Sequence, residues 1–283
     1  MLNLYTQENF YTFLKNRQSI LYLKSLESPP WTEDKILQTE KFCNIDREDD
    51  RGTINLREYI WENKRYTIED KIIFSFIYRF CVSSKTILEI SNLSPNKAFD
   101  EIISPNFKFS WSRSVPYHLP LISKKNRVKD DGSYEENLKW IVNKLYKNRY
   151  IIFKYLRNHR GIDHLRATEE LTNILKNILT KRFPFYIAQS LADLFFFTNY
   201  LDISGPTYLG IGALKGLNKM NKENLNNIEY IDKLIKEMPF DLLKLFPRGV
   251  YPVIIEHGLC EFTKYTEYLE GDRKRKYYFS KGE

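Results

Sequence analysis

Apolar residues recur every three or four positions along most of the chain, and this spacing constrains the fold more than any other feature of the sequence. In residues 67–82, Thr67 begins a Thr-Ile-Glu-Asp segment that is typical of a helix N-terminus. An apolar stripe at helical intervals follows it, made of Ile72, Ile73, Phe76, Ile77 and Phe80. Segments that alternate apolar and polar residues, as strands do, are almost absent. We therefore predict a mainly α fold.

Outside residues 67–82, the apolar spacing predicts further helices and one long connection between them. Between residues 104 and 133 the spacing fails, and prolines, basic residues and an Asp-Asp-Gly-Ser run predict one long irregular connection. We expect a single helical domain over 1–283, or two lobes of about 1–133 and 134–283 with a cleft between them. The other predicted helices cover 3–27 with a basic outer face that includes Arg17, then 53–64, 134–156 and 163–179 with Asp163 as N-cap, and one starting at Pro184.

The composition favours a polyanionic partner. Forty-four Lys and Arg residues against 36 Asp and Glu give a net charge of +8, and the chain holds 20 Tyr and 19 Phe. Nucleic acid fits this balance, although AT-rich codon usage would also explain it. Three widely spaced cysteines do not suggest a disulfide framework. No apolar run is long enough to span a membrane, so the expectation is a cytoplasmic protein without a membrane partner.

A dense group of polar residues occupies Lys41–Arg51, behind Trp31 and a helix that Thr32 is expected to cap. If this segment is helical, Asn44, Arg47, Glu48 and Arg51 share one face. That face is too polar for a core, whereas Phe42, Cys43 and Ile45 on the opposite side can pack. Two interpretations stay open, a solvated helix surface held by charge pairs and a functional site.

Four glycines lie between Gly205 and Gly216, with helical stretches on both sides. Gly210 and Gly212 flank one apolar residue ahead of a predicted helix start at Ala213, the layout of a helix-hairpin-helix turn. Such a turn presents backbone N–H groups to a phosphate, with Lys215 adding charge nearby. An ordinary glycine-rich connection is the alternative. The segment is neither a Walker A loop nor a dinucleotide-binding fingerprint.

Two further places carry titratable groups. Glu256, Cys260 and Lys264 are spaced to share one helix face, with His257 and Glu261 at its edge, so that a carboxylate, an imidazole and an amine come close enough to exchange protons or to ligate a cation. The alternative is an ordinary helix surface. Asp193 stands among bulky apolar residues and either turns outward to water or sits in a pocket.

In this order the segments resemble a helical family of phage thymine hypermodification, from about residue 10 to 278. The segments are Pro30-Trp31-Thr32, Phe42-Cys43-Asn44 with Arg47-Glu48 and Asp50-Arg51, the Asp193 helix, Gly210 to Leu217, and Glu256-His257 with Leu259-Cys260-Glu261 and Lys264-Tyr265. The family comprises the α-glutamyl/putrescinyl thymine pyrophosphorylases and the helical domain of 5-hydroxymethyluracil DNA kinases. The resemblance implies a DNA-glycosylase-like helical fold and polar site positions at Asn44, Arg47, Asp50, Arg51, Asp193, Glu256, His257, Glu261 and Lys264.

The resemblance also implies a reaction, in which an amine or amino acid displaces pyrophosphate from the activated methylene of a modified uracil in DNA. Arg47, Arg51 and Lys264 would stabilise the leaving group, and Glu256, Asp193 or His257 would accept the amine proton. Asn44 would read the uracil edge and Trp31 would stack on the flipped base. No cofactor or resident metal is predicted, and a divalent cation requirement is left open. The alternatives are a noncatalytic DNA-binding module acting with a separate kinase, and a base-excising glycosylase.

Overall fold

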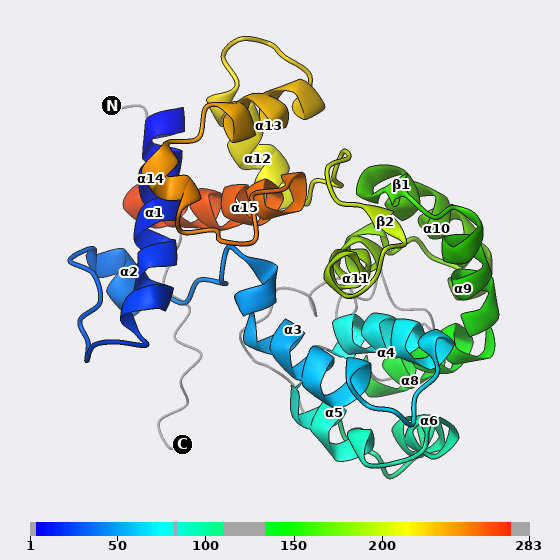
Figure 1. The fold of residues 1–283 in the computed structure, drawn as a ribbon. Helices are drawn as coiled ribbons and strands as arrows, with labels where there is room; N and C mark the ends of the chain where they lie inside the picture. The colour runs from blue at the N-terminus through cyan, green and yellow to red at the C-terminus, as the bar shows by residue number, and fades with distance from the viewer. Residues whose placement is uncertain (1–3, 82–83, 110–133, 273–283) are drawn as a thin grey trace. The chain divides into compact units, whose positions relative to one another are not determined.

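The computed structural model describes residues 4–81, 84–109 and 134–272, and the chain is mainly α, as predicted (Figure 1). It folds into two compact units, one of residues 1–50 with 203–283 and one of residues 51–202. These bounds differ from the lobes expected at about 1–133 and 134–283. Most of the long connection expected over 104–133 lies outside the described residues, as does the chain beyond residue 272.

The first unit is built around its last helix. This helix, α15 (Pro252–Leu269), packs against α1 (Gln7–Leu23), α12 (Ile211–Met220) and α13 (Asn227–Lys236), and Figure 1 shows it at the centre of this group. Gly258 allows α1 to approach, because a Cβ atom there would lie 2.7 Å from Leu14 Cδ2. The unit is completed by α2 (Lys35–Thr39), the 3₁₀ turn η1 (Arg47–Asp49) and α14 (Phe240–Leu243).

The second unit is organised by α4 (Ile68–Cys81), which packs against α11 (Pro184–Phe197) and two further helices, α8 (Tyr134–Lys147) and α9 (Arg149–Asn158). Thr67 and Asp70 exchange hydrogen bonds at the start of α4, and the whole predicted stripe from Ile72 to Phe80 is buried. The other elements are α3 (Arg51–Leu56), the π-helical turn η2 (Arg57–Trp61), α5 (Ser84–Ser91), α6 (Pro95–Ile103), α10 (His164–Leu179), and the strands β1 (Ile162–Asp163) and β2 (Leu201–Asp202).

Several local predictions are confirmed and others need correction. Asp163 caps α10, and Pro184 starts α11. The helix expected over 134–156 is interrupted at Asn148, between α8 and α9. Asp34 rather than Thr32 caps α2, because its carboxylate accepts the N–H groups of Ile36 and Leu37. The short strands β1 and β2 pair in parallel, with Ile162 opposite Leu201.

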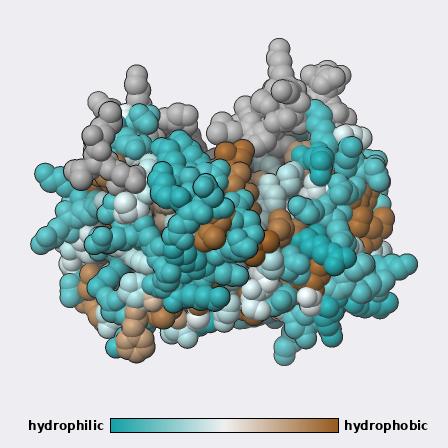
Figure 2. Space-filling view, turned by 90° about the horizontal axis from the view of Figure 1, so that it is seen from above, coloured by the Kyte–Doolittle hydropathy of each residue, from teal (hydrophilic) through white to brown (hydrophobic). Residues whose placement is uncertain are grey.

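The surface agrees with a protein that keeps its apolar residues in the two cores. On the face shown in Figure 2, hydrophilic residues cover most of the described surface and hydrophobic residues gather in smaller groups between them. No described helix is long and apolar enough to cross a membrane.

Candidate active site

The polar segment Lys41–Asp50 is not a helix, which corrects the expected face of Asn44, Arg47, Glu48 and Arg51. Residues 41–44 have no regular structure, and only the short turn η1 follows. Arg51 begins α3 and belongs to the second unit. The interpretation as a solvated helix is wrong as well, because the Arg47 side chain is buried.

Asp46 and Arg248 give the segment its shape. The Asp46 carboxylate is 1% exposed and accepts the backbone N–H of Glu48, which starts η1. Arg248 binds this carboxylate at 2.7 Å and Asp49 at 2.6 Å, and it lies 3.2 Å from Glu48. One guanidinium therefore gathers three carboxylates on one side of the segment, and this long-range contact prevails over the local helical spacing.

Helix α15 supplies the opposite side of the site. Pro252 stands at its first turn, where its missing N–H costs nothing, and Tyr251 enters the helix in an extended conformation. Most of the helix from Pro252 to Thr266 is buried, including Glu256, His257 and Glu261. The interpretation of this segment as an ordinary helix surface is therefore wrong.

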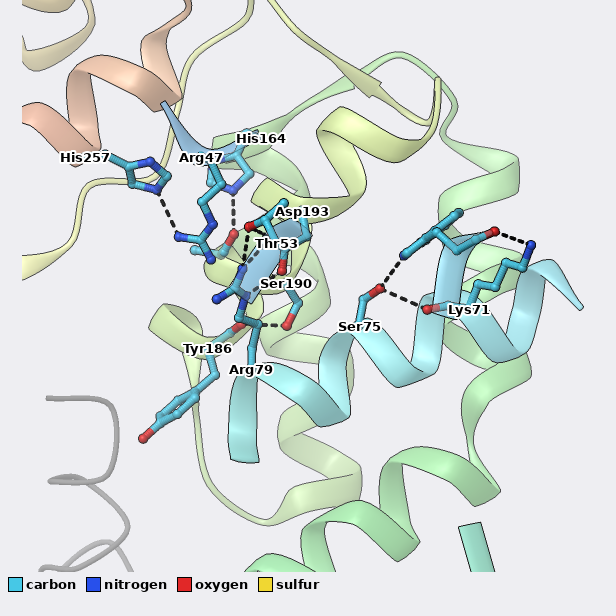
Figure 3. A network of polar contacts seen from close by, with 12 residues as sticks. Arg47, Thr53, Lys71, Ser75, Arg79, His164, Tyr186, Ser190, Asp193 and His257 are labelled. Atoms are coloured by element: carbon cyan, nitrogen blue, oxygen red, sulfur yellow. Dashed lines mark hydrogen bonds and ion pairs between the residues drawn. The ribbon is translucent and has the colours of Figure 1, made fainter. Parts of the chain in front are cut away.

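Three side chains meet where the two segments come together. Nη1 of Arg47 lies 3.2 Å from Nε2 of His257 (Figure 3), and this same Nε2 lies 3.6 Å from Oε2 of Glu256. The other Glu256 oxygen accepts the backbone N–H of Gly210 at 3.1 Å. Since arginine only donates, Nε2 of His257 acts as the acceptor in the Arg47 contact, which requires an imidazole with its proton on Nδ1.

Burial changes the acidity of Glu256. Desolvation raises the pKa of this carboxyl to about 7, and the nearby charge of Glu261 adds to the rise, whereas the Gly210 N–H and the Arg47 charge oppose it. A carboxyl with this pKa exists in both protonation states near neutral pH. Glu256 therefore has the property that general acid–base catalysis requires.

The raised pKa predicts a pH-dependent stability. Because the folded protein binds this proton more tightly than the unfolded chain, the free energy of unfolding should fall as pH rises from about 4.5 to about 7. Glu256→Gln keeps an acceptor for Gly210 and removes the charge, so it should stabilise the protein at about pH 8 by on the order of 3 kcal/mol more than at about pH 5. Urea denaturation at both pH values measures this.

The matched control is Glu267→Gln, which removes a carboxylate from the same helix where it pairs with Lys215. This variant should show no comparable gain at the higher pH. An equal effect of Glu256→Gln at both pH values would contradict the raised pKa.

A second layer of contacts holds the segment against α15. Glu261 accepts the backbone N–H of Cys43 at 2.9 Å. Lys264 lies 3.6 Å from Glu261, bonds the Lys41 carbonyl and stands over the Phe42 ring. These contacts tie residues 41–43 to α15.

Asn44, predicted to read a uracil edge, has its amide engaged within the protein. Its Oδ1 accepts from Arg17 at 2.5 Å, and its Nδ2 donates to the Asp49 carbonyl at 2.6 Å. Arg17 is buried in α1 and also binds the Phe42 carbonyl, so its expected place on a basic outer face is wrong. The amphipathic pattern of α1 does not distinguish this arginine from the lysines around it.

The glycine-rich segment is organised differently from the predicted phosphate-binding turn. Gly210 is the N-cap of α12, and its N–H is bonded to Glu256. Gly212 and Gly216 face α15, where added Cβ atoms would lie 2.9 Å from Cys260 Sγ and 3.2 Å from the Leu259 carbonyl oxygen. The two glycines therefore serve close helix packing, because these positions are filled by α15 and not open to a phosphate.

The packing role of Gly216 predicts a stability defect. Gly216→Ala should cost about 1–3 kcal/mol in the free energy of unfolding, because the new methyl group overlaps Thr263 and Leu259 on α15. Chemical denaturation measures it, and Asn218→Ala on the exposed side of α12 is the control. Unchanged stability combined with weaker DNA binding would instead support the phosphate-binding role.

The other predicted residues have the following surroundings. Asp193 lies in the second unit and is fully buried, which corrects the outward-facing alternative. Asp50 is half-buried at the end of η1. Trp31 donates its indole N–H to the Glu27 carbonyl and lies under Lys24, and Lys215 pairs with Glu267 at 2.6 Å.

The second unit contains a buried ion pair that sequence reasoning missed. Arg79 of α4 binds both oxygens of Asp193 of α11 at 2.5 Å, and Thr53 donates to the same carboxylate at 3.1 Å (Figure 3). The signal that could have revealed it is Arg79 itself, a charged residue next to the apolar stripe of α4. Within the described ranges, no cluster of three or more His, Cys, Asp or Glu residues forms a metal site.

The described residues thus define a mainly helical protein with a buried carboxylate, imidazole and guanidinium between its N-terminal segment and its last helix. Comparison with known proteins agrees with the resemblance seen in the sequence. Residues 5–108 match the family model of the helical domain of 5-hmdU DNA kinase. Over 110 residues the chain is 29% identical to a 5-hmdU DNA kinase of Bacillus phage SP10, a stretch that covers 37% of this chain and 16% of that protein. No solved structure matches the chain.

Proposed function

We propose that the protein modifies thymine-derived bases in DNA, as a transferase that replaces pyrophosphate on 5-(pyrophosphoryloxymethyl)uracil with an amine or amino acid. The observation that carries the proposal is the buried group of Glu256, His257 and Arg47 on α15 and the facing segment. The match to the helical domain of 5-hmdU DNA kinase supports DNA with a modified uracil as the substrate class.

In the proposed reaction, the amine nitrogen attacks the methylene carbon attached to C5 of the uracil. The new carbon–nitrogen bond forms as the carbon–oxygen bond to pyrophosphate breaks, and the leaving group takes that electron pair. The amine nitrogen then carries an extra proton, which Glu256 accepts in its ionised form. A pKa of about 7 suits this transfer at neutral pH.

The leaving pyrophosphate develops negative charge and needs a cation beside it. Arg47 is the group best placed for this task, because its guanidinium is buried next to His257 and charges are stronger in a desolvated site. Lys264 stands on the same helix as Glu256 and is the second candidate. The duplex base must be flipped out to reach such groups.

The second candidate function is a noncatalytic DNA-binding module that acts with a separate kinase. The family match favours it, since that match is to the helical domain of a DNA kinase. A base-excising glycosylase is a third candidate, in which Glu256 would activate water instead of an amine.

One experiment separates the three. The purified protein is incubated with duplex DNA containing the pyrophosphorylated base and a panel of amines, and released pyrophosphate, abasic sites and digested nucleosides are analysed. The transferase predicts pyrophosphate release together with an aminated nucleoside in the mass spectrum. Abasic sites would identify a glycosylase, and DNA binding without either product would favour the noncatalytic module.

A further inference from the structure

A long stretch of the second unit carries positive charge and no acidic residue. Residues 137–162 contain no Asp or Glu, in a chain whose overall charge is +8. The same stretch carries seven basic residues, namely Lys139, Lys144, Lys147, Arg149, Lys154, Arg157 and Arg160. It includes α9 and most of α8. Charge of one sign at this density marks a surface that attracts a polyanion.

Helix α9 presents this charge on one face. Ile152, Tyr155 and Leu156 are buried and attach the helix to the core. Tyr150, Lys154 and Arg157 are exposed and follow one another at steps of four and three positions, which places them on the opposite side of α9. Lys147, the last residue of α8, is exposed just ahead of this helix. Tyr150 is 59% exposed, so an aromatic ring stands among the cations.

These cations are not neutralised locally. Among residues 4–81, 84–109 and 134–272, no carboxylate forms an ion pair with Lys147, Lys154, Arg157 or Arg160. Arg157 instead stands over the Phe153 ring and Arg160 over the Tyr200 ring. Rings hold the arginine stems in place and leave their positive charge available to a ligand.

We propose that the exposed face of α9, defined by Tyr150, Lys154 and Arg157, together with Lys147 at the end of α8, binds the sugar-phosphate backbone of DNA. From Tyr150 to Arg157 the helix rises by about 10 Å, which is comparable to the rise of about three phosphates along one DNA strand. Tyr150 suits stacking on an unpaired base beside that backbone. This inference rests on the proposed function in one respect, which is that DNA is taken as the polyanion.

Fluorescence anisotropy with labelled duplex DNA tests the proposal across a series of salt concentrations. The variant Lys147→Gln/Lys154→Gln/Arg157→Gln should bind at least about tenfold more weakly at low salt. Its slope of log K against log salt concentration should also be shallower by about 3, since three phosphate contacts are lost. The control Lys15→Gln/Lys85→Gln/Lys233→Gln removes the same charge from lysines that face Asp241, Glu89 and Glu223.

Two outcomes overturn the inference. One is a salt slope and an affinity that are equal in the α9 variant and the control variant. The other is loss of binding to anionic lipid vesicles in the α9 variant while DNA binding is unchanged. Circular dichroism melting curves must match before the comparison is made. If the wild-type protein binds DNA through α9 and releases no pyrophosphate, the transferase function fails and this inference stands.

Discussion

Glu256→Gln is expected to lower the rate of amine transfer by about 10²- to 10⁴-fold, the range that a positioned general base contributes. The variant keeps the hydrogen bond from Gly210 and the size of the side chain, and it loses only the ability to accept a proton. The measurement is pyrophosphate release in single-turnover reactions, so that product release does not mask the chemical step. Glu267→Gln on the same helix should retain the wild-type rate.

The pH dependence gives this prediction a second readout. In the wild-type protein the rate should rise with pH up to about 7, as Glu256 loses its proton. In Glu256→Gln the residual rate should lack this rise. If the variant reacts at the wild-type rate with the wild-type pH profile, the base is another group and the proposed role of Glu256 is wrong.

Removing one partner of the Arg79–Asp193 pair should produce the largest loss of stability in the second unit. Asp193→Leu leaves a buried guanidinium without its carboxylate, and we expect a cost of about 3–5 kcal/mol in the free energy of unfolding. Arg79→Met should cost a similar amount. Chemical denaturation of both variants measures these values.

The double variant Arg79→Met/Asp193→Leu separates a charge effect from a packing effect. It removes both charges together and should be much less destabilised than the sum of the two single variants. Glu89→Ala, which breaks the exposed pair with Lys85, should change the stability little and serves as the control. Additive losses in the double variant would show that the ion pair itself is unimportant.

The helices could be predicted where local spacing and burial agree. In α4 the Thr67–Asp70 start and the apolar stripe point to the same element, and the structure contains it. The segment around Arg47 could not be predicted, because Arg248, about two hundred positions further on, determines its conformation. The local spacing of apolar residues contains no information about such a long-range contact.

Only part of the candidate site could be predicted, because the chemistry of its residues is visible in the sequence and the packing around them is not. Residue chemistry singled out Glu256, His257 and Arg47, and the structure brings these three together. The glycines beside them were harder to interpret, since close helix packing and phosphate binding both require a missing side chain. Only the position of α15 shows that Gly212 and Gly216 are used for packing.

The division of the chain also bears on how the protein is made by the ribosome. The first unit consists of residues 1–50 and 203–283. The buried face of α1 is therefore covered only after α15 has been synthesised. Residues 51–202 emerge in between and are continuous, which lets them fold while synthesis proceeds. The side chains of Arg47 and His257 therefore meet only after residue 257 has left the exit tunnel, and nascent chains halted earlier would expose the apolar face of α1.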